Sequence, residues 1–453
     1  MKMPKSPPKF DELLAQEISH KRVGQILQLA EKLPADDYLH WDELRRRPPP
    51  EGIRHEQWWL ALKLKRKAAN RTIPLLDKTG QPFTYFITDK VQELLHEIDF
   101  GAGAYVGMPE PIVNPQTRDR YIVSSLIQEA ITSSQLEGAV TTREVANDML
   151  RSGRPPRDDS ERMILNNYLT MQEIIRIKDQ PLSVPLLLDI HRMVTSQALK
   201  KPDAAGRFRR SDEPVHVVDG EGNIYHAPPD ADELQTRAEK MCAFANGQTP
   251  GPFVPPVIRA ILLHFWLAYD HPFYDGNGRT ARALFYWSML HHHFWLFEFI
   301  SISSIILKAR TQYARAFLYT ESDENDLNYF ILHQADVIRR AVTALHDYLG
   351  RKQQEQQTAA TQLRSLRQYN HQQQALLMHA LRHAGAEYSI ESHKASHAVA
   401  YATARSDLLT LEKAGLLTKA KRGKEMFFEP GFDLLRKLEA ISKKRPAPTT
   451  ETM

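Results

Sequence analysis

Twelve residues, from His271 to Arg282, constrain this chain more than any others, because they combine a proline break, two glycines and several charged side chains. They read His-Pro-Phe-Tyr-Asp-Gly-Asn-Gly-Arg-Thr-Ala-Arg. Apolar residues at helical spacing predict a buried helix over 259–269, which should end near His271 because proline disfavours the helical conformation in the preceding residue. Residues 280–289 contain no glycine or proline, which predicts a second helix. We therefore expect the loop 276–278 to lie at a helix N-terminus.

This placement favours an anion at the loop. Free backbone N–H groups and the positive end of a helix attract negative charge, and glycines let a phosphate approach the backbone. Asp275 offers a carboxylate of the kind that Mg²⁺ binds together with phosphate oxygens, and Asn277 offers an amide donor. Arg279 and Arg282 share a helix face, from which both can reach an oligophosphate. His271, with an unperturbed pKa of roughly 6.5, is suited to taking a proton from a hydroxyl.

In this order the residues resemble the Fic motif, His-Pro-Phe-x-Asp/Glu-Gly-Asn-Gly-Arg-x-x-Arg, and every defined position is filled. The resemblance implies a helical Fic core that transfers AMP from ATP to a protein hydroxyl of Tyr, Thr or Ser and releases pyrophosphate, with Mg²⁺ bound. It assigns His271 as the base and Asp275 as the metal ligand, while Tyr313 resembles a residue of the helix that closes the adenine pocket. The candidate ATP-binding residues are Phe273, Asp275, Gly276, Asn277, Gly278, Arg279, Arg282 and Tyr313. Phe273 is also expected to be an anchor in the core. The plainer alternative is a glycine-containing loop between two helices, with a satisfied histidine in the core.

A second segment resembles the family's inhibitory motif, Ser/Thr-x-x-x-Glu-Gly/Asn, with Ser133, Glu137 and Gly138 at the required positions. Apolar spacing predicts a helix over 121–137 that the glycine ends in a left-handed conformation. A carboxylate at a helix C-terminus opposes the helix dipole by a few tenths to about 1 kcal/mol, so Glu137 should have a compensating partner. The resemblance implies that this partner is Arg282 and that the pairing keeps the ATP γ-phosphate from its productive position. A solvated glutamate before a glycine is the alternative.

Residues 187–191 and 206–209 are similar to the helix and turn that precede the family's substrate-binding flap. Two short apolar stretches, 215–218 and 223–226, flank an Asp-Gly-Glu-Gly turn and predict a β-hairpin. Such a flap can pair with an extended target segment and set its hydroxyl in line with the α-phosphate. The candidate flap contacts are Val215 and Val217. The same hairpin can also serve only to cover the core.

Length and cysteine content bound the class of protein. The chain has 453 residues, enough for two or three domains, and its 42% hydrophobic and 25% charged residues are ordinary for a soluble protein. Cys242 is the only cysteine, so an intrachain disulfide and a cysteine-based zinc site are excluded. The first residues lack the apolar core of a signal peptide, and the apolar stretches 257–269 and 283–300 are interrupted by polar residues. We expect a cytoplasmic protein that does not contact a membrane.

Together, the local sequence patterns and the resemblance imply a mainly α protein with a helical Fic core, a β-hairpin flap and a C-terminal winged helix. A single amphipathic helix over 10–32 and a small hairpin within 74–87 are expected near the N-terminus. The expected domains are an N-terminal mostly helical region (1–105), a Fic domain (106–350) with an inhibitory helix (121–138), a glutamine-rich connector (351–374), a winged-helix domain (375–440) and a disordered tail (441–453).

The basic charge is concentrated at the C-terminus. Residues 351–453 carry 17 Lys and Arg against 10 Asp and Glu, whereas the whole chain has a net charge of +4. Predicted helices over 376–383, 390–399 and 403–414, followed by a two-stranded wing over 419–428, resemble the winged helix found behind many bacterial Fic domains. The candidate contacts to DNA phosphates are Arg405, Lys421, Arg422 and Lys424. Winged helices also bind proteins, so both kinds of partner remain open.

Two classes of function remain. The first is an autoinhibited AMP transferase, with a variant in which Glu137 positions a water that removes AMP from a modified protein. The second is a DNA-binding regulator whose Fic core only senses nucleotide. The intact His271 favours the transferase, because a nucleotide sensor needs no general base. The partners that these interpretations allow are a target protein, the chain itself as a target, duplex DNA and a second copy in a homodimer.

Overall fold

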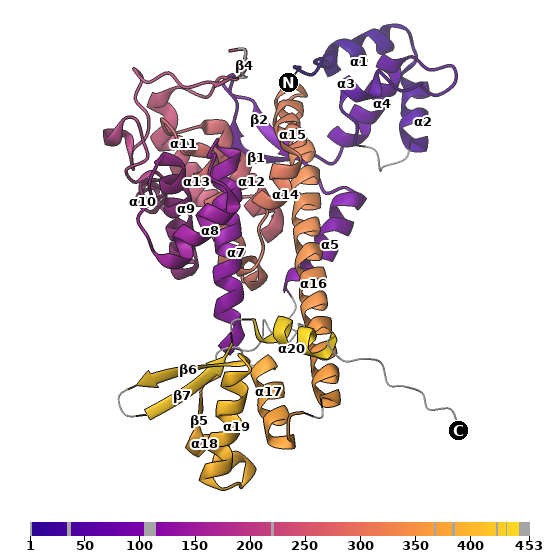
Figure 1. Ribbon diagram of the computed structural model, residues 1–453. Helices are drawn as coiled ribbons and strands as arrows, with labels where there is room; N and C mark the ends of the chain where they lie inside the picture. The colour runs from indigo at the N-terminus through magenta and orange to yellow at the C-terminus, as the bar shows by residue number, and fades with distance from the viewer. Residues whose placement is uncertain are drawn as a thin grey trace, which may run out of the picture. The chain divides into compact units, whose positions relative to one another are not determined.

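The computed structural model describes residues 2–33, 38–103, 115–218, 222–366, 368–382, 386–422, 425–431 and 433–443. Most of these residues are helical and the sheets are small, which confirms the mainly α fold class (Figure 1). The chain forms two compact units, Met1–Ala104 with Ser124–Thr343, and Tyr105–Val123 with Ala344–Met453. The helices α7 (Pro115–Leu136) and α16 (Asn328–Ser365) each contribute to both units. In the described part of the chain, no helix has the length and apolar content that crossing a bilayer requires.

The first unit begins with a small group of helices packed around two buried tryptophans, Trp41 and Trp59. These helices are α1 (Phe10–Ser19), α2 (Val23–Lys32), α3 (Trp41–Leu44) and α4 (His55–Lys67). The prediction of a single helix over 10–32 is wrong, because the chain turns at Lys21, whose φ of 55° lies in the left-handed region. The expected hairpin is present as β1 (Arg71–Leu76) paired antiparallel with β2 (Pro82–Tyr85).

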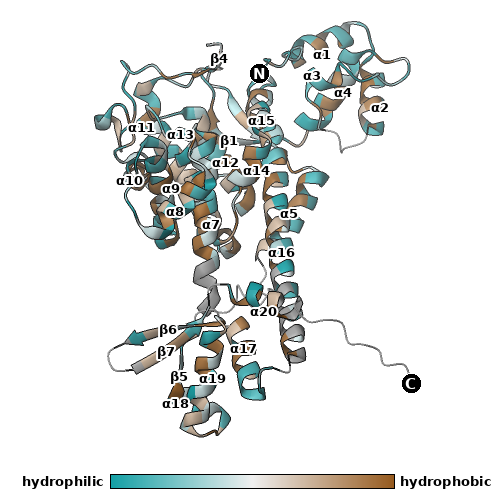
Figure 2. Ribbon diagram, in the orientation of Figure 1, coloured by the Kyte–Doolittle hydropathy of each residue, from teal (hydrophilic) through white to brown (hydrophobic). Residues whose placement is uncertain are grey.

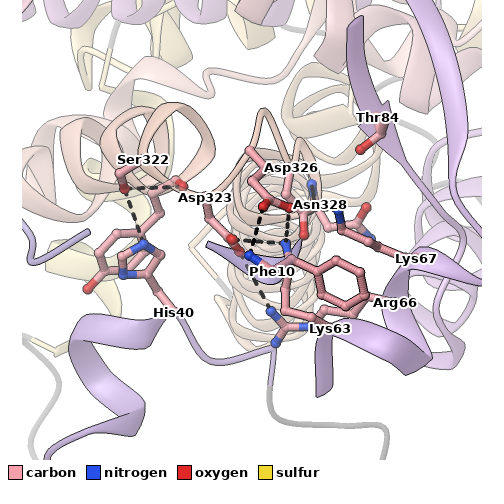
Figure 3. A network of polar contacts seen from close by, with 12 residues as sticks. Phe10, His40, Lys63, Arg66, Lys67, Thr84, Ser322, Asp323, Asp326 and Asn328 are labelled. Carbon is pink, nitrogen blue, oxygen red and sulfur yellow. Dashed lines mark hydrogen bonds and ion pairs between the residues drawn. The ribbon is translucent and has the colours of Figure 1, made fainter. Parts of the chain in front are cut away.

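A buried network of charged and aromatic side chains joins this N-terminal part to the turn after α15 (Arg310–Ser322) (Figure 3). Lys63 Nζ lies 2.8 Å from Asp323 Oδ1, and both side chains are almost completely buried. Arg66 donates to the hydroxyl of Tyr329 at 3.0 Å. His40 contacts the hydroxyl of Ser322 at 3.1 Å. The N-terminal helices are therefore part of the first unit.

The centre of the first unit is a pair of helices that are buried on nearly all sides, α12 (Pro256–Asp270) and α13 (Asn277–His291). Helix α12 is mainly apolar, as an interior helix requires, whereas α13 also buries the polar motif residues Asn277, Arg279 and Arg282. The motif loop lies between these two helices. The surrounding helices are α5 (Asp89–Gly103), α8 (Arg143–Ser152), α9 (Asp159–Ile177), α10 (Val184–Thr195), α11 (Leu234–Ala245), α14 (Ser303–Lys308), α15 and parts of α7 and α16. Short 3₁₀ turns lie at Pro202–Ala204, Ala231–Glu233 and Trp295–Glu298.

The second unit has its own apolar core and one three-stranded antiparallel sheet of order β5-β7-β6. Its elements are α17 (His371–Arg382), β5 (Tyr388–Ser389), α18 (Ile390–His397), α19 (Tyr401–Lys413), β6 (Leu417–Arg422), β7 (Glu425–Pro430) and α20 (Leu434–Lys443). Figure 2 shows both polar and apolar residues along α17 and α19, as helices with one buried face require. The glutamine-rich segment is helical through residue 365, because α16 continues into it.

Candidate nucleotide-phosphate site

The turn that follows α12 places His271 and sets its tautomer. His271 caps the helix in the left-handed conformation, with φ 44° and ψ 54°, and Pro272 prevents the helix from continuing. Its Nδ1 lies 3.2 Å from the carbonyl oxygen of Ala268, which only accepts hydrogen bonds, so Nδ1 carries the ring proton and Nε2 carries the lone pair. Burial lowers the pKa of His271 to about 4. The ring is therefore neutral near pH 7, which is the state that a general base needs.

The side chain of Asn277 shapes the loop after this turn. Its Oδ1 accepts from the N–H of Phe273, and its Nδ2 donates to the carbonyl oxygen of Phe273, both at 2.9 Å. We expected this amide to donate to a phosphate, but the structure uses it to close the loop, because a buried amide must satisfy its polar atoms. Gly276 has φ 83°, and a Cβ there would lie 2.6 Å from Cγ2 of Thr195. Only glycine fits this position without strain.

The side chains of Phe273 and His191 pack against each other beneath the backbone of the loop and hold it in place. Phe273 is completely buried, and its ring stacks on that of His191 with 3.7 Å between centroids. Its side chain is therefore the anchor in the core that the sequence predicts, and its contact with ATP stays a prediction. His191 Nδ1 accepts from the N–H of Gly206 at 3.1 Å, so its Nε2 carries the proton and donates to the carbonyl oxygen of Asp275 at 2.9 Å. The sequence pattern included His191 but did not reveal this role.

The two motif arginines have different surroundings in α13. The Arg282 guanidinium is buried and donates to Oγ and the carbonyl oxygen of Ser133 and, at 2.8 Å, to Oε1 of Glu137. Arg279 is also buried and donates to the carbonyl oxygen of Val194 at 3.1 Å. Its Nε has no hydrogen-bond partner in the described part of the chain. A buried donor without a partner is costly, so this atom suits an anionic ligand.

Glu137 occupies the space over the loop. A Cβ added to Gly278 would lie 2.1 Å from Oε1 of Glu137, so the carboxylate stands at the N-terminus of α13. Burial opposes its ionisation, but the charge and hydrogen bond of Arg282, together with Arg279, outweigh that effect and lower the pKa of Glu137. The side chain remains 32% exposed. An ionised carboxylate therefore stands where a helix N-terminus attracts an anion, and Arg282 is the partner that we expected for it.

The metal candidate lies at the edge of the loop. The carboxylate of Asp275 is 58% exposed and stands 3.8 Å from Nη2 of Arg279. Exposed carboxylate oxygens suit Mg²⁺, which binds to one or two protein ligands and keeps waters and phosphate oxygens as the others. Across the described residues, no group of three or more His, Cys, Asp or Glu side chains could hold a metal ion. The donor set thus fits a metal that arrives with a phosphate ligand.

The adenine candidate, Tyr313, lies among aromatic side chains. Its hydroxyl is 2.9 Å from Nε2 of His264, and its ring contacts Phe317 and Phe330. The Arg282 charge acts on its pKa, which burial nevertheless raises to about 12. Tyr313 therefore lies on the Arg282 side of the loop.

The flap is shorter than the sequence predicts. Strand β3 contains only Val217–Val218, which pairs with β4 (Ile224–His226) across a bulge, and Val215 lies outside it. The buried Glu213 accepts hydrogen bonds from Arg207 and from the backbone of Arg210, so the preceding chain is held in a turn and the strand starts late. Val217 and Val218 are 37% and 52% exposed, so the hairpin presents an apolar edge to solvent. Residues 219–221 lie outside the described part.

The candidate DNA contacts lie in the second unit. Arg405 on α19 and Lys421 on β6 are exposed. Lys424, the side chain of Arg422 and the expected tail beyond residue 443 lie outside the described residues.

A mainly helical fold in which a histidine turn leads into a glycine loop at a helix N-terminus defines a class of nucleotide-phosphate-binding domain. Residues 181–289 match the family model described as the Fic/DOC family. A crystal structure of a Fic family protein from Desulfovibrio desulfuricans covers 77% of this chain and 98% of that one, with a TM-score of 0.51 and 19% identity, and so shares the fold. The chain therefore carries a Fic/DOC family domain over residues 181–289.

Two relatives carry the description protein adenylyltransferase Fic. The Nematostella vectensis protein is 29% identical over 199 residues, which cover 43% of this chain and 43% of that protein. The Drosophila melanogaster protein is 35% identical over 120 residues, 26% of this chain and 21% of that protein. The chain thus spans less than half the length of these curated relatives.

Proposed function

We propose that this chain transfers AMP from ATP to a hydroxyl of a protein, and that Glu137 restrains this activity. The observation that carries the proposal is a neutral imidazole, His271, next to an anion position at the N-terminus of α13. The relatives described as protein adenylyltransferases support the same reaction. The acceptor is a Tyr, Thr or Ser side chain, either of a target protein or of the chain itself.

In the proposed step, Nε2 of His271 takes the proton of the acceptor hydroxyl while its oxygen attacks the α-phosphorus of ATP. A phosphate ester bond forms to that oxygen, and the bond to the bridging oxygen of the β-phosphate breaks, so pyrophosphate leaves with the negative charge. The backbone N–H groups at the start of α13 and the guanidinium of Arg279 stabilise this charge. The partnerless Nε of Arg279 supports this assignment.

Asp275 would hold Mg²⁺ at the loop edge, where the ion neutralises phosphate charge when bound. The role of Asn277 in this proposal is to keep the loop in a shape that receives phosphate, since its amide is bonded to Phe273. Tyr313 is proposed to contact adenine because it lies beside Arg282.

Autoinhibition follows from competition for the same groups. The Glu137 carboxylate lies against Gly278 and uses Arg282, and both would otherwise serve the γ-phosphate. A phosphate and a carboxylate that share one position repel each other, so ATP binds in an unproductive arrangement while the ion pair is intact. In the bifunctional alternative, the same carboxylate orients a water that hydrolyses the AMP ester.

The test measures intact mass after incubation with ATP and Mg²⁺. We expect Glu137→Gly to raise self-modification by AMP about tenfold or more, which corresponds to about 1.4 kcal/mol of barrier. The Glu137→Gly/His271→Ala variant serves as the inactive control. A single variant no more active than wild type would reject inhibition by Glu137. Loss of AMP removal in that variant would instead favour the bifunctional enzyme.

We also propose that the second unit is a winged-helix domain that contacts DNA phosphates. The exposed Arg405 and Lys421 and the basic excess of residues 351–453 support this. The full chain should bind duplex DNA with an affinity that falls steeply with salt, and Arg405→Ala should reduce that dependence. Arg436→Ala, an exposed arginine on α20, is the matched control. Absence of binding at low salt would favour a protein partner.

A further inference from the structure

His226, the last residue of the flap strand β4, joins the flap to the catalytic turn. Its Nε2 lies 2.7 Å from the carbonyl oxygen of Tyr269, two residues before His271. Its Nδ1 lies 2.7 Å from Oε2 of Glu321 on α15. The His226 side chain is 8% exposed, so few waters can replace these partners. The end of the flap is thus bonded to both α12 and α15.

Arg209, which precedes the flap, is hydrogen-bonded to the same turn. Its Nε donates to the carbonyl oxygen of His271 at 3.0 Å, and its backbone N–H donates to the carbonyl oxygen of Pro272 at 2.9 Å. Its Nη2 donates to the carbonyl oxygen of Pro229, which follows β4. Both ends of the flap are therefore bonded to the backbone around His271.

The partners of His226 require an extra proton. The carbonyl of Tyr269 only accepts, so Nε2 must carry a hydrogen. An ionised Glu321 also only accepts, so a proton must lie between its carboxylate and Nδ1. Loss of that proton would set the Nδ1 lone pair against a carboxylate oxygen at hydrogen-bond distance, which is repulsive.

The other charged groups around His226 leave Glu321 as its partner. Asp270, at the end of α12, is neutralised by Arg237 of α11, whose Nη2 lies 2.6 Å away. The ring of Tyr269 packs 4.8 Å from that of His226 between centroids. His271 and Arg209, which also face this region, add positive charge or none. The contact of Nδ1 is with the carboxylate of Glu321.

We propose that His226 and Arg209 are positioning residues that hold the flap at a fixed place relative to His271, and that the proton shared by His226 and Glu321 keeps the flap attached. This inference rests on the proposed function, in which the flap sets the acceptor hydroxyl near His271. Loss of these hydrogen bonds detaches the flap and slows transfer, while the phosphate loop keeps its affinity for ATP.

Hydrogen exchange of flap amides in the full chain tests this without any need for activity. We expect His226→Gln to speed exchange of residues 222–228 at neutral pH by about tenfold relative to the intrinsic rate, because Gln can donate to Tyr269 but not also to Glu321. His216→Gln, an exposed flap histidine, is the matched control. Unchanged exchange in His226→Gln, or equal acceleration throughout α12, would overturn the proposal.

A double variant tests the shared proton. In His226→Gln/Glu321→Gln the amide at 321 can donate to the amide oxygen at 226, so protection of the flap should return. In the Glu137→Gly background, self-modification should fall in His226→Gln and recover in the double variant, with the ATP affinity unchanged throughout. Failure of the double variant to restore protection would overturn the role of the proton. Absence of any self-modification would count against the proposed function, and the exchange result would still decide on the flap.

Discussion

Single residues in the motif divide the work between the chemistry and the shape of the loop. His271 has its proton on Nδ1 and its lone pair on Nε2, because its Nδ1 contacts a backbone carbonyl oxygen, which only accepts. Asn277 and Phe273 use their polar or aromatic groups within the loop and the core. Substitutions of His271 should therefore affect turnover, whereas substitutions of Asn277 or Phe273 should affect the shape of the loop.

We expect His271→Ala to reduce AMP transfer by about 100-fold or more, because general-base catalysis contributes 10²–10⁴-fold. The affinity for ATP should change little, since the imidazole does not hold phosphate. Calorimetry with ATP and intact-mass rates, both in the Glu137→Gly background, measure the two quantities. His216→Gln is the control. Transfer at the unsubstituted rate would show that His271 is not the base.

Glu137 also contributes to stability, but less than a fully buried partner would. Breaking a buried ion pair from one side costs about 3–5 kcal/mol, whereas an exposed pair contributes about 0–1 kcal/mol. Because Glu137 is 32% exposed, we expect Glu137→Gln to lower the free energy of unfolding by about 1–2 kcal/mol. Urea unfolding measures this, and saturating ATP should restore part of the loss by giving Arg282 a new anionic partner. A variant that ATP stabilises no more than wild type would contradict the competition.

At the scale of elements, the helix pair α12 and α13 supplies a rigid frame, and the other elements present single groups to it. The turn after α7 brings Glu137, α10 brings His191, and the flap base brings His226. The N-terminal helices are held by buried charges rather than by apolar contact alone, which makes their attachment sensitive to the loss of one partner (Figure 3).

Lys63→Met tests this attachment. It leaves Asp323 buried without its closest cation, so the free energy of unfolding of the first unit should fall by about 3–5 kcal/mol. Lys63→Met/Asp323→Asn should recover part of the loss, because the uncompensated charge is removed. Lys67→Met, in which the lost side chain is 37% exposed, is the control. Equal effects of Lys63→Met and Lys67→Met in urea unfolding would show that burial of the pair is unimportant.

At the scale of the whole molecule, buried neutral histidines make the first unit sensitive to acid. Burial lowers the pKa values of His40 and His191 to about 4, and the side chains are not exposed to solvent. Unfolded histidines take up protons near pH 6.5. Between these pH values the unfolded state binds more protons than the folded state. The contribution of these two histidines to the free energy of unfolding is therefore present above about pH 6.5 and is lost as the pH falls toward 4.

Each of these two histidines should contribute on the order of 3 kcal/mol to this pH dependence. Thermal unfolding of the full chain between pH 7 and 4 measures it, and His40→Gln should flatten the profile. His20→Gln, an exposed histidine, should leave it unchanged. A profile with the same slope in both variants would show that His40 is protonated in the folded state.

Much of the fold was predictable because its signals are local. The two helices around the motif, the glycine that ends α7, the first hairpin and the helices and hairpin of the second unit follow from periodicity and turn residues. The break between α1 and α2 at Lys21 was not predictable, because a lysine in the left-handed conformation has no sequence signal comparable to that of glycine. The shortened strand at Val217 follows from the ion pairs that the buried Glu213 makes with Lys201 and Arg207, which the strand pattern does not reveal.

By itself, the sequence determined which residues line the loop and which helices carry them, since proline, glycine and apolar spacing act on neighbouring residues. Only the tertiary structure decided what each side chain does there. Glu137 lies over Gly278, His191 under Phe273 and His226 against Tyr269, and the members of each pair are far apart in the chain. Such contacts depend on how complete helices pack, so burial and hydrogen-bond geometry, rather than local propensity, assign the protons and charges of the site.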